Sequence, residues 1–333
     1  EYCFAARLGW AERGFTSALK SVWRDARASI AWLVIPVLLL IAAFDALSVA
    51  STLGVTLSPL ESILLTAGFS IGLIVFGLPR LLQHFFPTEA VEPSQEAWLS
   101  SVAESAGVRG CRFRRWKTQG LVFNAMIAGV APKSRVMLIS DRLLDEASPE
   151  HLTMIILHEL AHARRRHVLV RILSMIPAWA CGAAVQTLII RTMPETPIAE
   201  YAGCVGNLIA ISLTFVTLRL VSHWIEFDAD RVACELSPCI AFELSRGREA
   251  SAVSSERFQV PPSTVEARQQ LSDALIEVTR DDPSATQRSW LHPSVSERVV
   301  RLKRDDPWVA DCRESSFAQF APGAQETYPG AEA

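Results

Sequence analysis

The sequence predicts a mainly α-helical membrane protein, in which four transmembrane helices carry a cytoplasmic α+β domain with a small β-sheet. Two observations lead to this prediction: four apolar stretches of membrane-spanning length, and an uneven distribution of basic residues between them. Half of the 333 residues are hydrophobic and only 20% are charged, which is apolar for a soluble chain. The net charge of −3 gives no indication of a nucleic-acid partner, whereas the apolar stretches predict a lipid bilayer as one.

The four apolar stretches are close to the roughly 20 residues that a helix needs to cross a bilayer. The second contains Gly68, Gly72 and Gly77, and small residues of this kind let membrane helices approach closely. The last two are near the lower limit of length, so a buried helical hairpin of a soluble domain is the alternative for them. The stretches are 30–50, 62–78, 172–190 and 201–218.

Lys and Arg residues precede the first stretch and follow the second and fourth, whereas the two short loops have almost none. By the positive-inside rule, the N-terminus, the central region and the C-terminus are cytoplasmic. Residues 246–288 are rich in Ser, Gln and charge and are expected to form a mobile insert. The predicted segments are an N-terminal segment (1–29), two helices (30–80), a first domain part (81–167), two helices (168–221), a second domain part (222–310) and a disordered tail (311–333).

The residues that indicate a chemistry begin with an H-E-x-x-H motif, from His158 to His162. The flanking residues are typical of a helix, on which residues four apart share a face. Both imidazoles can therefore reach one metal ion. Glu159 lies beside them as a base for a metal-activated water, as in a zinc hydrolase. An exposed helix with two surface histidines is the alternative for the motif alone.

A two-histidine zinc site needs a third protein ligand, and an acidic segment follows the fourth apolar stretch. Glu226 and Asp230 are four residues apart, so that Glu226 can complete the site for one Zn²⁺ per chain. Asp230 can accept a hydrogen bond from a ligand histidine and fix its tautomer. Two spans separate His162 from Glu226, which returns the chain to the same side of the membrane. A solvated acidic patch is the alternative, and Asp228 is expected at the surface.

The motif helix is expected to continue directly into the third apolar stretch, which places the metal close to the membrane surface. This position predicts substrates that are membrane proteins or that approach along the membrane. His167 would lie roughly 140° around that helix from His162. We therefore expect it near the lipid headgroups and not at the metal. The arginines at 164–166 would anchor the helix at the cytoplasmic surface.

Several local patterns lie between about residues 100 and 302. They are an N-A-x-x-x-G strand (124–129), a second strand with its turn (136–144), the Ser-Pro-Glu before the motif helix (148–150), an E-x-x-A-D segment (226–230) and an H-P-x-x-x-x-R stretch (292–298). Together they resemble one family, the integral-membrane zinc metallopeptidases that include the bacterial protease HtpX and the CAAX prenyl protease. The chain departs from this family at Ser222-His223, where the family often has Ser-Arg.

The resemblance implies a gluzincin-like domain with a small sheet from about residue 111 to 140. Asn124 and Ala125 would lie on an exposed strand edge, to which a substrate peptide adds as a further strand. His292 or Arg298 would stabilise the oxyanion or brace the zinc ligands, with helix packing as the alternative. The protein would be a multi-pass protein of the bacterial inner membrane. It would cleave protein or peptide substrates at the cytoplasmic surface, for example in membrane-protein quality control.

Two other functions fit part of the sequence. Residues 163–167 resemble the basic stretch that follows H-E-L-A-H in the antibiotic-sensing membrane proteases, which suggests a signalling protease that cleaves one regulator. A non-enzymatic membrane scaffold with a vestigial site is the third hypothesis, and the intact metal and base residues disfavour it. Residue 1 is Glu, so we expect the natural start of the chain to lie upstream. The sequence indicates no particular oligomeric state.

Overall fold

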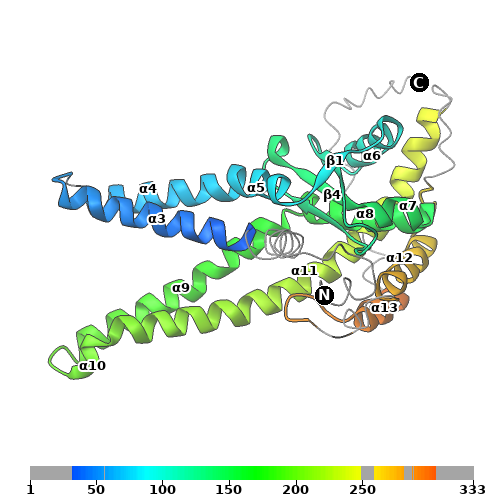
Figure 1. The fold of residues 1–333 in the computed structure, drawn as a ribbon. Coiled ribbons are helices and arrows are strands. Elements are labelled where there is room, and N and C mark those ends of the chain that lie inside the picture. The colour runs from blue at the N-terminus through cyan, green and yellow to red at the C-terminus, as the bar shows by residue number, and fades with distance from the viewer. Residues whose placement is uncertain (1–31, 56, 249–258, 281–286, 288, 305–333) are drawn as a thin grey trace, which may run out of the picture.

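Two pairs of long helices extend from a domain built around a small sheet (Figure 1). The computed structural model describes residues 32–55, 57–248, 259–280, 287 and 289–304, so the expected segment 1–29 and tail 311–333 lie outside the described residues. The first pair comprises α3 (Trp32–Thr52), α4 (Pro59–Gly72), a π-helical turn (Leu73–Gly77) and α5 (Leu78–Phe85). The second pair comprises α9 (His167–Thr192) and α11 (Ala202–Arg248), joined through the short α10 (Pro197–Glu200).

Three helices of the described chain are long and apolar enough to cross a membrane: Leu64–Phe85, His167–Thr192 and Ala202–Ser245. The described part of the first expected stretch, Val34–Ala50, is a shorter apolar helix. The described parts of the four expected stretches are therefore helical, although the fourth continues unbroken into the domain as far as Arg248. In the most apolar 18-residue segment of α9, and in that of α11, only 11% is buried. This low burial disfavours the alternative of a buried hairpin in a soluble domain.

Helices α9 and α11 approach closely where Gly182 faces Gly206. A Cβ atom on Gly182 would lie 2.4 Å from the carbonyl oxygen of Gly206, and one on Gly206 would lie 2.7 Å from that of Gly182. Such a contact between backbones is possible only without side chains. A close helix contact was also expected at Gly68 and Gly72. That expectation is wrong, because a Cβ atom on either glycine would have no described atom within 4 Å.

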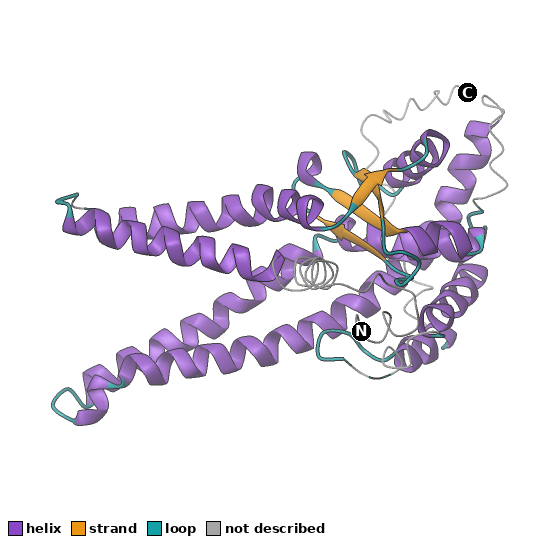
Figure 2. Ribbon diagram, viewed as in Figure 1, coloured by secondary structure: helices purple, strands orange, loops and turns teal. Residues whose placement is uncertain are grey.

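The sheet of the domain has four strands in the order β1-β2-β4-β3 (Figure 2). The predicted region 111–140 contains three of them, and β1 precedes it. The buried strand β4 lies inside the sheet, which leaves β3 at an edge. The strands are β1 (Thr88–Ala90, antiparallel to β2), β2 (Arg112–Trp116, parallel to β4), β3 (Ala125–Ala128, antiparallel to β4) and β4 (Val136–Ser140).

The core of the domain lies between this sheet and the helices that cover it. Helix α8 crosses the middle of the core, where Met154, Ile156, Leu157 and Leu160 are fully buried. It begins at Pro149, because the Ser148 side chain accepts a hydrogen bond from a backbone N–H of the first turn. The helices of the domain are α6 (Pro93–Ser105), α7 (Asp141–Glu146), α8 (Pro149–Arg164), α12 (Thr264–Thr279) and α13 (Val295–Lys303), with a 3₁₀ turn at Pro132–Ser134.

The expectation of a mobile insert over 246–288 is wrong for residues 259–280, which contain α12 and pack in the core. Ala267, Leu271 and Ala274 are at most 1% exposed, and their spacing places them on one helix face. The Ser237 hydroxyl donates to the Pro261 carbonyl oxygen at 2.7 Å and ties the start of this segment to α11. Residues 249–258, 281–286 and 288 lie outside the described residues.

Candidate metal centre and active site

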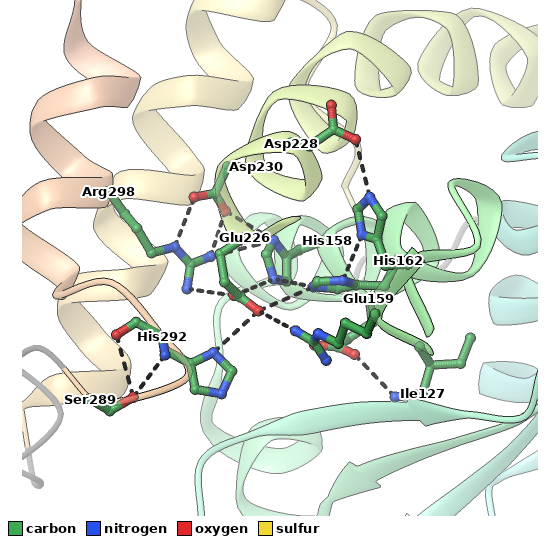
Figure 3. A network of polar contacts seen from close by, with 12 residues as sticks. Ile127, His158, Glu159, His162, Glu226, Asp228, Asp230, Ser289, His292 and Arg298 are labelled. Carbon is green, nitrogen blue, oxygen red and sulfur yellow. Dashed lines mark hydrogen bonds and ion pairs between the residues drawn. The ribbon is translucent and has the colours of Figure 1, made fainter. Parts of the chain in front are cut away.

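Two helices bring together the three side chains proposed as metal ligands (Figure 3). The Nε2 atoms of His158 and His162 are 3.1 Å apart. They lie 3.6 Å and 3.8 Å from the two carboxylate oxygens of Glu226. Ligands about 2.0–2.1 Å from a tetrahedral Zn²⁺ are about 3.3 Å from one another. Two imidazoles and one carboxylate at these separations fit zinc.

Burial of neighbouring residues fixes the direction in which each ligand points. On α8, Leu157 and Ala161 are fully buried in the core, and each directly precedes one of the two histidines. On α11, Ile225 and Ala229 are fully buried in the same way, which turns Glu226 and Asp230 toward α8. The packing of one face of α8 and one face of α11 therefore determines where the ligand side chains point.

His158 is oriented by a buried carboxylate and guanidinium. Its Nδ1 lies 2.9 Å from Asp230 Oδ1, so that Nδ1–H donates to Asp230 and Nε2 faces the ligand cluster. Arg298 Nε donates to the other Asp230 oxygen at 2.8 Å, and a second nitrogen of Arg298 also binds Asp230. An Arg298 nitrogen lies 3.4 Å from His158 Nδ1, but both atoms carry hydrogen in this tautomer, so that contact is not a hydrogen bond.

His162 is oriented by a residue that the sequence analysis placed elsewhere. His167 is 2% exposed; its Nδ1 lies 2.9 Å from His162 Nδ1, and its Nε2 lies 3.1 Å from Asp228. Three expectations are therefore wrong: a continuous helix, His167 at the headgroups and Asp228 at the surface. Helix α8 ends at Arg164, and Arg166 has φ 54, a left-handed conformation that turns the chain and points His167 back at the site.

Glu159 lies beside the ligand cluster and is held by the edge strand. Its Oε2 accepts a hydrogen bond from the Ile127 backbone N–H at 3.1 Å. Burial raises the pKa of Glu159 to about 7, although the charge of His158 acts in the opposite direction. A cation bound between the ligands would lower that pKa. A carboxylate in this position can reach water beside the ligand cluster and accept its proton.

The edge strand β3 presents backbone groups to the cleft. Ser140 N–H donates to the Asn124 carbonyl oxygen at 3.0 Å, so Asn124 faces β4. The backbone hydrogen-bonding groups of successive residues in an antiparallel strand point alternately toward and away from the neighbouring strand. The N–H and C=O groups of Ala125 and Ile127 therefore point away from β4. The exposed Asn124 side chain accepts from the Ala125 N–H at 2.9 Å. Asn124 and Ala125 therefore lie at the edge of the sheet.

A cleft of about 590 Å³ runs along this edge past the ligand cluster. Its far wall is apolar and comes from α12, through Leu271, Leu275 and Val278. His292 is open to the cleft, and its Nδ1 lies 3.2 Å from a Glu226 oxygen. Arg171 of α9 also reaches the cleft, with a nitrogen 3.5 Å from Glu226.

Four residues or segments near the site were missed or misplaced by the sequence analysis: His167, Asp228, Arg171 and the α12 wall. The available signals were weak. Arg171 is a lone basic residue at the start of an apolar stretch. The apolar positions of α12 recur at helical spacing within a polar composition.

Comparisons with known proteins agree on one family. The family model described as Peptidase family M48 matches residues 92–306. The chain is 24% identical over 225 residues to "Protease HtpX homolog" of Persephonella marina, covering 63% of this chain and 75% of that protein. It is 23% identical over 248 residues to "Protease HtpX homolog 2" of Methanosarcina mazei, covering 70% and 83%.

The fold is similar to that of a solved structure, the crystal structure of S. mikatae Ste24p, with a TM-score of 0.52 at 16% identity. The match covers 87% of this chain and 66% of that one, so the chain spans just under two thirds of the length of that protein. The resemblance to HtpX-type metalloproteases that the sequence motifs carry is confirmed. Because the family model covers more than half of its residues, the chain belongs to peptidase family M48.

Proposed function

We propose that this protein is a membrane-embedded, zinc-dependent endopeptidase that hydrolyses peptide bonds of protein substrates at the cytoplasmic membrane surface. The observation that carries the proposal is the convergence of three ligand atoms next to Glu159, in a cleft bordered by a free strand edge. His158, His162 and Glu226 would hold one zinc ion. When bound there, zinc acts as a Lewis acid that polarises a peptide carbonyl and makes water acidic near neutral pH.

Glu159 is proposed as the general base. Its carboxylate accepts the proton of the attacking water and then gives that proton to the leaving amine. The Ile127 N–H holds one carboxylate oxygen, which leaves the other free to face the water. Asp230 and His167 hold the imidazoles of His158 and His162 with Nε2 toward the metal.

Substrate is proposed to bind as an additional strand along β3. The backbone carbonyl groups of Ala125 and Ile127 point away from β4 and can accept hydrogen bonds from an extended peptide, which gives affinity with little dependence on sequence. The apolar wall from Leu271 to Val278 favours apolar side chains opposite that edge. Asn124, at the end of the strand, can bond a peptide group through its exposed amide.

His292 and Arg298 are assigned different tasks. His292 is 58% exposed on its side chain and lies near Glu226 in the cleft, so it can donate to the carbonyl oxygen that gains negative charge. Arg298 is buried and pairs with Asp230, which favours the bracing role over contact with substrate.

The site is proposed to lie at the membrane surface. Helix α9, a candidate span, begins at His167, five residues after a metal ligand. Trp290 of the loop before His292 packs against Phe215 of α11, with ring centroids 5.3 Å apart. The basic residues next to the spans favour a cytoplasmic domain, and a bacterial inner membrane is the proposed location.

The test is proteolysis of a denatured model protein by the zinc-loaded, detergent-purified chain beside its Glu159→Gln variant. We expect cleavage by the parent only, with a loss of at least about 10²-fold in the variant and equal zinc in both. Equal cleavage by both proteins would refute the role of Glu159. Zinc binding without cleavage by the parent would contradict broad specificity and favour a signalling protease with one substrate.

A further inference from the structure

A second cavity, of about 490 Å³, lies between α11, α12 and α13 near the junction of α8 and α9. Apart from Arg298, none of its described lining residues also lines the active-site cleft. Neither the motifs nor the proposed catalysis makes use of this space, which we call the basic cavity. The side chains that line it include Arg165, Arg231, Arg268, Arg298, Arg301 and Arg304.

The wall of the basic cavity carries a surplus of positive charge. Its described lining has six guanidinium groups and three carboxylates, a net charge of +3. Each carboxylate is already bonded to an arginine: Asp228 to Arg165 at 2.9 Å, Asp230 to Arg298, and Glu235 to Arg231 at 2.8 Å. Arg301 and Arg304, at the C-terminal end of α13, carry further positive charge into the cavity, and an anion is the ligand that balances it.

The other part of the wall is aromatic and aliphatic. Trp224 is 53% exposed, and the Arg301 guanidinium lies over the Phe227 ring, 4.6 Å from its centroid. An arginine in this position is pre-oriented to bind a phosphate through two parallel N–H groups. The cavity thus combines a site for a phosphate with an apolar surface.

The position of the basic cavity indicates the source of the phosphate. Trp224 lies on α11 four residues after Leu220, which is 66% exposed on the face expected to meet lipid. Arg165 lies two residues before α9, another candidate span. Trp and Arg at the end of a spanning segment are typical of the headgroup layer.

We propose that the basic cavity binds the phosphate headgroup of an anionic phospholipid from the adjacent leaflet. Arg301 and Arg304 contact the phosphate, and Trp224 packs against the glycerol and upper acyl chain. Asp228 connects this cavity to the metal centre, because it bonds Arg165 and Arg231 on one side and His167 on the other. We therefore also expect anionic lipid to change the rate of peptide cleavage, and this second part rests on the proposed function.

The direct test is native mass spectrometry of the full chain, released from micelles containing equal phosphatidylglycerol and phosphatidylcholine. We expect retention of phosphatidylglycerol by the parent, and a loss of about tenfold or more in an Arg301→Gln/Arg304→Gln variant. The matched control is Arg109→Gln/Arg112→Gln, which removes the same charge from exposed residues beside and in β2 and should retain lipid like the parent.

Equal retention of both lipids by the parent, or equal loss in the control, would overturn the proposal. A further arm adds millimolar inorganic phosphate: complete displacement of phosphatidylglycerol would assign the cavity to a soluble anion and overturn the lipid assignment. Cleavage of the model protein is measured on the same samples. A parent that binds lipid but never cleaves contradicts the proposed function and leaves the lipid site standing.

Discussion

His167 should be needed for tight zinc binding although it is not a ligand. It lies between His162 and Asp228 and is 2% exposed, so its removal leaves His162 Nδ1 without its hydrogen-bond partner. His162 would then no longer be fixed with Nε2 toward the metal. Loss of a hydrogen-bond partner of a metal ligand costs about 10–100-fold in metal affinity, or about 1.4–2.7 kcal/mol.

Two substitutions separate the contacts that His167 makes. Ala removes both hydrogen bonds, whereas the carbonyl oxygen of Asn can replace Nδ1 as the acceptor from His162. We therefore expect zinc affinity to fall in the order parent, His167→Asn, His167→Ala. The full 10–100-fold loss is expected for Ala only. Asp228 keeps Arg165 and Arg231 as partners in both variants, which limits the loss of stability.

The assay is competition for zinc with a chromophoric chelator at fixed pH. His151→Ala is the matched control, because His151 lies on the same helix and bonds Glu277, away from the metal centre. Its zinc affinity should equal that of the parent. Unchanged affinity in His167→Ala, or an equal loss in the control, would refute the role assigned to His167.

Two further predictions concern the fold, and the midpoint of thermal unfolding measures both. Gly182→Ala places a Cβ 2.4 Å from a backbone oxygen and should cost about 1–3 kcal/mol, whereas Gly72→Ala meets no described atom within 4 Å and should be neutral or stabilising. Equal effects would contradict the close helix contact. Leu271→Ala in the buried face of α12 should cost about 2–5 kcal/mol, and Val265→Ala, 75% exposed on the same helix, less than about 0.5. An unchanged midpoint in Leu271→Ala would contradict the packing of α12 in the core and favour the mobile insert.

The proposed ligand set could be predicted from sequence because it depends on local geometry. Residues four apart on a helix share a face whatever surrounds them, so His158 with His162 and Glu226 with Asp230 follow from spacing alone. The hydrogen-bond partner of His162 could not be predicted. It depends on a helix break at Arg166, and an arginine with positive φ leaves no signal of the kind that a glycine gives.

The same distinction applies to the fold. Length and hydropathy were enough to predict the apolar helices, because the bilayer sets both. Which glycines form a helix contact depends on which helices pair, so Gly182 and Gly206 were not singled out. Strand β1 has three residues, too few for a periodic pattern. The apolar face of α12 was obscured by the polar residues on its other side.

The most direct test of the proposed metal centre is the zinc K-edge absorption spectrum of the purified chain, with metal content measured beside a Glu226→Gln variant. We predict one zinc per chain in the parent, with only nitrogen and oxygen ligands at about 2.0–2.1 Å and the signature of two imidazoles. The variant should retain little zinc. A sulfur ligand at about 2.3 Å, or full zinc with an unchanged spectrum in the variant, would contradict the assignment of His158, His162 and Glu226.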